Sequence, residues 1–422
     1  MGKDSSRSRL KLGLLAKIII SIALGVGAGF IFPEFLTRVF VTFNSLFSSF
    51  LNFFIPLIIL GLVAPAIADI GKGAGRMLLV TVCLAYLFTL FSGFLAFGVS
   101  HFFFPPMLEN NLQVALPDEI TGPLPYFTID FPPLFGVMTA LIAAFVFGIG
   151  MTSLDSFVMK NFFDEFRSIV EKTIANVIIP VLPVYIFGIF LNMTYTGQVG
   201  NILLVFIKII AVIFILHVFL LLLQFTIAGI AVKKNPLKLL LNMLPAYFTA
   251  LGTQSSAATI PVTLKQTVSN GVSEDVAGFT VPLCATIHLS GSTMKIVCCA
   301  IALMIIRDIH YDFNLMAGFI CMLGVTMIAA PGVPGGAIMA SLGVLSSMLG
   351  FGDADLALMI ALYIAMDSFG TACNVTGDGA ISLIVNKIFK KTKIQQQNTY
   401  CKQDGVSFQS KKALSKTPTP YL

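Results

Sequence analysis

The stretch Ala357-Leu-Met-Ile-Ala-Leu-Tyr-Ile-Ala-Met-Asp-Ser-Phe-Gly-Thr-Ala-Cys-Asn-Val-Thr-Gly-Asp378 is apolar over its first half and polar on one face over its second half. Two carboxylates in a membrane helix are costly, so they are expected to face an internal cavity. The stretch therefore predicts a membrane helix whose polar face binds an ion, a substrate or a partner. The alternative is a structural stripe at a helix interface, although carboxylates exceed what packing needs. The polar residues recur at intervals of 4, 3 and 4, the repeat of one helical face: Asp367, Thr371, Asn374 and Asp378.

The composition places the whole chain in a membrane. Of the 422 residues, 57% are hydrophobic and 11% are charged, and the mean hydropathy is +0.93, which no ordinary soluble domain reaches. The first run ends in no small-residue cleavage site, so we expect a retained helix rather than a signal peptide. Apolar runs long enough to cross a bilayer core of about 30 Å lie at Leu12–Phe32, Phe40–Ile67, Met77–Phe104, Leu134–Leu154, Thr173–Leu191 and Ile202–Val232.

Basic residues gather at the N-terminus and in alternate loops. The loop Pro105–Asp130 carries four acidic residues and no Lys or Arg. The positive-inside rule then predicts a multi-pass protein of the cell membrane with cytoplasmic termini, residues 1–11 and 389–422, the second being a disordered tail. The net charge of +6 lies in loops and tails and indicates no nucleic-acid partner.

Three apolar segments of the C-terminal half are interrupted. Tyr247–Pro261 is crowded with hydroxyls and small residues, and Ala329–Ala337 holds two Pro and three Gly. Two broken segments of this kind indicate an inverted-repeat transporter with hairpins that enter the membrane and return. Between them, Phe279–Ile306 is interrupted at Thr286–Ser292, where an unwound helix would free carbonyls for a cation.

In its motifs the chain resembles the glutamate transporter homologue family, the dicarboxylate and neutral amino-acid:cation symporters. Three motifs carry the resemblance, which covers about residues 12–388: Gln-Ser-Ser-Ala-Ala-Thr-Ile-Pro (254–261), Gly-Val-Pro-Gly-Gly-Ala-Ile-Met (332–339) and Asp-Ser-Phe-Gly-Thr-Ala-Cys-Asn-Val-Thr-Gly-Asp (367–378). The resemblance implies an all-α polytopic fold with inverted repeats, eight transmembrane helices and two re-entrant hairpins, at about 238–268 and 314–350. It also implies a homotrimer in lipid, with helices 1, 2, 4 and 5 as scaffold. Helices 3, 6, 7 and 8 with the hairpins would form a moving transport domain.

The same resemblance implies a substrate site and ion sites. Asp367 would accept the ammonium of an amino acid, and Asn374 with the backbone near Ser256 would bind its carboxylate. Further residues of the substrate pocket would be Ser292, Gly335, Gly370 and Thr371. One sodium site would combine the Asp378 carboxylate with carbonyls of Cys284, His288 and Asn374, and a second would use backbone oxygens of Thr286, Met327, Ile328 and Ala330. A hard cation prefers such oxygen ligands.

Two departures from the family pattern bear on substrate and coupling. Acidic-substrate members have an Arg where this chain has Gly370, and a free side-chain carboxylate needs such a cation in a desolvated pocket. The family's buried sodium-binding Asp in helix 7 is Ser290 here. In helix 3, Tyr86 and Thr89 match that third site, but Leu90 replaces a small hydroxyl residue. The resemblance thus implies two sodium ions, with the third site lost or remade.

We therefore predict a secondary transporter, not an enzyme, that imports a small neutral amino acid such as serine, threonine or alanine with sodium. The alternatives are an acidic amino-acid or dicarboxylate symporter, and a proton-coupled transporter or exchanger in which His288 and Lys295 replace a cation. A channel filter or a metal-dependent enzyme would need repeated or clustered ligands, which the sequence lacks. Lys295 either supplies a fixed ammonium in place of a bound ion or extends toward an interface.

Overall fold

The computed structural model describes residues 13–71, 75–108, 122–154, 157–197, 199–332 and 334–403. All regular structure in these ranges is helical, as the sequence predicts. The predicted cytoplasmic N-terminus, residues 1–11, lies outside the described residues. The N-terminal half forms α1 (Leu14–Gly29), α2 (Glu34–Gly71), α3 (Arg76–Leu108), α4 (Val137–Ser153), α5 (Phe157–Thr173), the π-helical turn η2 (Ile174–Ile178), α6 (Ile179–Tyr195) and α7 (Val199–Val232).

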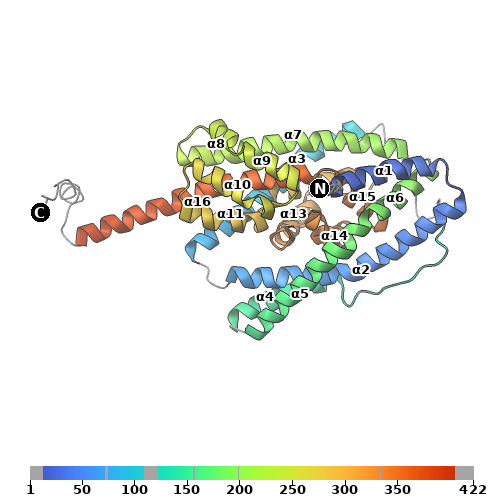
Figure 1. Ribbon diagram of the computed structural model, residues 1–422, viewed down its shortest axis with the longest axis horizontal. Coiled ribbons are helices and arrows are strands. Elements are labelled where there is room, and N and C mark those ends of the chain that lie inside the picture. Colours follow the sequence, from blue (N-terminus) through green and yellow to red (C-terminus); the bar gives the residue numbers. More distant parts are fainter. Residues whose placement is uncertain are drawn as a thin grey trace, which may run out of the picture.

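Five of these helices, α1, α2, α4, α5 and α6, pack on one another and are called here the α2 group. The long helix α2 contacts α4, α5 and α6, while α1 lies against α6. Small residues allow that last approach, because a Cβ at Gly29 would lie 2.3 Å from Cβ of Thr194. Figure 1 shows α2, α4 and α5 along one edge of the molecule and α7 along the opposite edge.

The remaining helices form a second body, called here the α12 group. In it, α12 packs on α3, and α16 packs on α7, α9 and α11. The two groups meet where α2 contacts α13 and α14 and where α1 and α6 contact α15. Besides α3 and α7, the group contains α8 (Pro236–Asn242), α9 (Leu244–Thr253), α10 (Ser256–Ser269), α11 (Glu274–Ile287), α12 (Ser290–Ile306), α13 (Phe313–Ile328), α14 (Gly336–Leu349), α15 (Asp353–Ala365) and α16 (Asp367–Gln403).

Several helices of the described chain are long and apolar enough to cross a membrane, which confirms the prediction of a multi-pass membrane protein. There are five of them by this measure, or six if α15 and α16 count as one bent span. Helices α1 and α4, with 16 and 17 residues, are shorter than this measure requires. The five are Glu34–Asp69, Arg76–Leu108, Phe157–Tyr195, Leu203–Val232 and Glu274–Ile306.

The two segments predicted as hairpins each form a pair of helices in contact, α9 with α10 and α13 with α14. In the first hairpin (α8–α10), the chain reverses at Gln254, whose φ of 54° is left-handed, and Ser255 caps α10 by accepting the N–H of Ala258. In the second hairpin, α13 ends at Ile328 and α14 begins at Gly336. The tips touch, because Oγ of Ser255 donates to the carbonyl of Gly332 at 3.3 Å.

The C-terminal helix extends further than the sequence predicts. The tail was expected to leave regular structure at residue 389, whereas α16 continues to Gln403. Lys and Gln are good helix formers, so a polar sequence need not end a helix that has already begun. Residues 404–422 lie outside the described residues. There the disordered tail stays a prediction.

Candidate functional site

Two long helices of the α12 group are broken, and residues next to the two breaks contact each other. Between α11 and α12, His288 and Leu289 are not helical, within the predicted interruption Thr286–Ser292. Between α15 and α16, the axis bends by 62° at Met366. The sequence does not predict this second break, since no Gly or Pro marks it. Each break exposes backbone N–H and C=O groups that a continuous helix would pair internally.

A small cavity lies between the two hairpin tips and the two broken helices. Its volume is about 20 Å³, which is room for about one water molecule. The cavity as it stands is therefore too small for an amino acid. Among the residues predicted for substrate and ions, those that line it are Ser256, Thr286, Ser292, Ala330, Asp367, Thr371 and Asn374.

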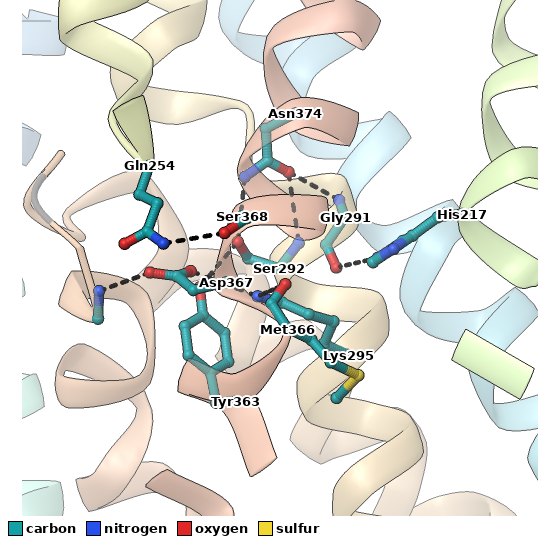
Figure 2. Close-up of polar contacts among 11 residues, drawn as sticks. His217, Gln254, Gly291, Ser292, Lys295, Tyr363, Met366, Asp367, Ser368 and Asn374 are labelled. Atoms are coloured by element: carbon teal, nitrogen blue, oxygen red, sulfur yellow. Dashed lines mark hydrogen bonds and ion pairs between the residues drawn. The ribbon is translucent and has the colours of Figure 1, made fainter. Parts of the chain in front are cut away.

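Asn374 ties the two broken helices together. Its Oδ1 accepts the N–H groups of Gly291 at 2.8 Å and Ser292 at 3.3 Å, and its Nδ2 donates to Oγ of Ser292 at 3.0 Å. Figure 2 shows Asn374 above Ser292, with Tyr363 approaching from the other side. The hydroxyl of Tyr363 donates to the same Oγ at 3.0 Å. Asn374 thus satisfies the first N–H groups of α12 and keeps one amide hydrogen for a ligand.

Asp367 is buried and already has two partners from other segments. Its Oδ2 accepts the N–H of Gly335 in the second hairpin at 2.8 Å, and its Oδ1 lies 3.4 Å from Nζ of Lys295. The same Nζ is 3.3 Å from the carbonyl oxygen of Met366 and 3.6 Å from the ring centroid of Tyr363. Lys295 has no exposed surface. The expectation that it extends toward an interface is therefore wrong.

Gly370 lies beside the Lys295 side chain rather than on the cavity. A Cβ at this position would lie 2.5 Å from both Nζ and Cε of Lys295. The resemblance placed Gly370 in the substrate pocket, where a glycine in place of Arg would leave space. The structure shows that Lys295 fills that space, which sequence alone could suggest only from the joint presence of this Gly and this Lys.

Asp378 pairs with the side chain of His288. Nδ1 of His288 and Oδ1 of Asp378 are 2.9 Å apart, and both residues are about 1% exposed. The resemblance assigned only the His288 carbonyl to a sodium site, so this side-chain contact was missed. The N–H of His288 donates to the carbonyl of Cys284 at 2.9 Å. Neither Asp378 nor His288 lines the cavity that Asp367 lines.

Neutral groups occupy the region of the family's third sodium site. Oγ of Ser290 accepts from Nε2 of Gln224 at 3.1 Å, and the carbonyl of Ser290 accepts from Oγ of Ser92 at 2.8 Å. Tyr86 donates its hydroxyl to the carbonyl of Cys321 at 3.2 Å. Lys295 lies at Asp367 instead. It therefore does not take the place of an ion beside Ser290.

Two helix C-termini meet at the other side of the cavity. Helix α11 ends at Ile287 and α13 ends at Ile328, next to the cavity residues Thr286 and Ala330. The carbonyl of Met327 accepts the N–H of Ala330 at 3.2 Å. Carbonyl oxygens at helix C-termini carry partial negative charge and are suitable ligands for a cation.

Comparison with known proteins finds relatives along most of the chain. A serine/threonine transporter, SstT, of Acinetobacter baumannii is 27% identical over 391 residues, which cover 87% of this chain and 95% of the relative. The SstT of Streptococcus suis is 29% identical, covering 78% and 93%. An excitatory amino acid transporter of Caenorhabditis elegans is 27% identical, covering 65% and 56%. The profile of the sodium:dicarboxylate symporter family matches residues 14–388, and the chain belongs to that family.

Proposed function

We propose that the protein is a sodium-coupled symporter that imports a small neutral amino acid of the serine, threonine or alanine type. One observation carries this proposal: a cavity between two hairpin tips and two broken helices is lined by a carboxylate, an amide and hydroxyls. The substrates named for the SstT relatives support the neutral class.

In this proposal, each part of an amino acid has a partner at the cavity. Asp367 receives the ammonium, and the free amide hydrogen of Asn374 with the N-terminus of α10 at Ser256 receives the carboxylate. Thr371 and Ser292 then face a small hydroxyl side chain. An acidic side chain would be desolvated without a dedicated cation, because position 370 is a glycine, where acidic-substrate members of the family have an Arg.

Two sodium ions accompany the substrate in the proposal. The first binds the Asp378 carboxylate with the carbonyls of Cys284, His288 and Asn374. The second binds Thr286 and the end of α13 at Met327, Ile328 and Ala330. The neutral hydrogen bonds around Ser290 argue against a third ion, because a buried sodium ion is favoured by an anionic ligand.

The proposed architecture has eight transmembrane helices and two re-entrant hairpins. The α2 group is the scaffold of a homotrimer in the cell membrane, and the α12 group is the transport domain that moves against it. The packing supports this division, since the helices contact one another mainly within their own group. Both termini lie in the cytoplasm in this arrangement.

Uptake into proteoliposomes tests the proposal. Labelled serine should enter on an imposed sodium gradient and not on an imposed proton gradient of the same size. Excess unlabelled serine, threonine or alanine should compete more strongly than aspartate or glutamate at neutral pH. Uptake driven by protons alone, or preferential competition by aspartate, would contradict it. Aspartate preference would indicate that Lys295 leaves Asp367 to bind an acidic side chain.

A further inference from the structure

Among the residues whose burial is described, Lys295 is the only lysine that is fully buried. Its side chain is 0% exposed, and its Nζ lies between the Asp367 carboxylate, the carbonyl of Met366 and the face of the Tyr363 ring. These three are an anion, the end of helix α15 and an aromatic π-face, and each attracts a cation. The site is built to hold a positive charge at Asp367.

Helix α16 has a glycine where the Lys295 side chain packs against it. Every residue except Gly at position 370 would bring a Cβ within 2.5 Å of the ammonium. The position of Lys295 therefore depends on Gly370, because the lack of a side chain at this point of α16 leaves room for the ammonium from α12. Figure 2 shows the Lys295 side chain reaching the backbone between Met366 and Asp367.

We propose that Lys295 is a tethered cation that binds Asp367 when no substrate is present and gives up this place to the ammonium of the amino acid, while its own ammonium keeps the Met366 carbonyl and the Tyr363 ring as partners. The inference rests on the proposed function and specifies how its substrate site works. Lys295 is then a specificity-determining residue, because a ligand must bring its own ammonium to displace it from Asp367.

The physical reason is the cost of a buried carboxylate. Without a partner, the Asp367 anion would be strongly destabilised in the closed site, and the transport domain could not close without cargo. A tethered ammonium removes this cost but competes with substrate. The apparent affinity for substrate is then the intrinsic affinity multiplied by the fraction of time that Asp367 is free.

The test is serine binding to purified Lys295→Met and wild-type proteins. Removal of the competitor should tighten serine binding by about tenfold or more, a gain that misfolding cannot produce. In proteoliposomes, the variant should keep serine–serine exchange and lose net uptake into serine-free vesicles. Lys208→Met is the matched control, because Lys208 lies in the apolar helix α7 and donates to the carbonyl of Met107 at 3.0 Å, away from the cavity. It should change neither readout.

Gly370→Ala provides an independent route that keeps the lysine. Its methyl group should push the ammonium off Asp367 and also tighten serine binding. The effect should disappear in the Lys295→Met background, since there is no ammonium to displace. This variant decides the question even if Lys295→Met does not fold.

Unchanged or weaker serine binding in Lys295→Met and Gly370→Ala, beside a wild type that transports serine, overturns the tethered cation and leaves the proposed function intact. Lys295 would then be a structural cap of the α15–α16 bend. A wild type that binds succinate and not serine overturns both, because it shows that the Lys295 ammonium binds the ligand.

Discussion

The two buried carboxylates of α16 have similar surroundings and different access. Asp367 pairs with Lys295 from α12, and Asp378 pairs with His288 from the break before α12. A glycine of α16 leaves room for each basic side chain. A Cβ at Gly370 would lie 2.5 Å from Nζ of Lys295, and a Cβ at Gly377 would lie 2.7 Å from Cε1 of His288. Asp367 lies on the cavity wall, whereas Asp378 does not.

This difference in access separates two roles that residue type alone does not distinguish. A carboxylate on the cavity can exchange its protein partner for a group on the substrate. A carboxylate enclosed by protein is open only to a partner small enough to reach it, such as a bare ion. The comparison therefore supports the proposed roles, in which Asp367 binds substrate and Asp378 binds sodium. Each of the following experiments tests one of these two roles.

The largest effect is expected from Asp367→Asn. Removing one partner of a buried charge pair typically costs about 2–5 kcal/mol, so serine binding should fall more than tenfold and the melting temperature should drop. The control is the double variant Asp367→Asn/Lys295→Met, in which no charge is left unpaired. Its melting temperature should recover and its serine binding should not. Normal transport by the single variant would place the substrate elsewhere.

Asp378→Asn should weaken the sodium dependence of serine binding first and serine affinity second. In the proposed function both ligands bind the α12 group, and such coupling is reciprocal and typically worth about 1–3 kcal/mol. Serine affinity measured over a range of sodium concentrations checks this. Asp355→Asn is the control, because Asp355 is buried and paired with Arg307 at 2.7 Å, away from the cavity. An equal sodium effect in Asp378→Asn and wild type would refute the assignment.

Gly335→Ala should weaken serine binding through the second hairpin. The φ of Gly335 is +76°, and its N–H donates to Asp367, so a Cβ would strain this backbone by about 1–3 kcal/mol. Gly350 has a φ of +71° at the other end of α14 and makes no contact with the site. Gly350→Ala should lower the melting temperature similarly without changing serine affinity. Equal affinity losses in both variants would mean that only general stability is involved.

The smallest effect is expected from Tyr363→Phe. The change removes the hydrogen bond to Ser292 and keeps the ring face beside Lys295, so it should cost about 0.5–1.5 kcal/mol and weaken serine binding a few-fold. Tyr185→Phe loses a comparable buried bond, 2.9 Å to Ser48, in the α2 group. It should affect melting temperature alone. No change in serine affinity in Tyr363→Phe would exclude Tyr363 from the substrate site.

Local patterns in the sequence determined the elements of this fold. Hydropathy located the long apolar helices, and clusters of small and hydroxyl residues located the ends of the helix pairs at Gln254 and Gly335, because these properties depend on neighbours within a few positions. The interruption before Ser290 was predicted for the same reason. The bend at Met366 was not, since it has no Gly or Pro and exists only where Lys295 and the hairpin tip meet it.

The partners of the polar residues were decided by tertiary structure. Sequence spacing placed Asp367 and Asp378 on one face of one helix. Their partners lie 72 and 90 residues away, and no local period relates residues at such separations. The position of Lys295 shows this most clearly, because the sequence left open whether its ammonium replaces a bound ion or extends toward an interface. Only the packing of α12 against the space at Gly370 placed its ammonium at Asp367, because burial of a charge depends on the whole surrounding fold.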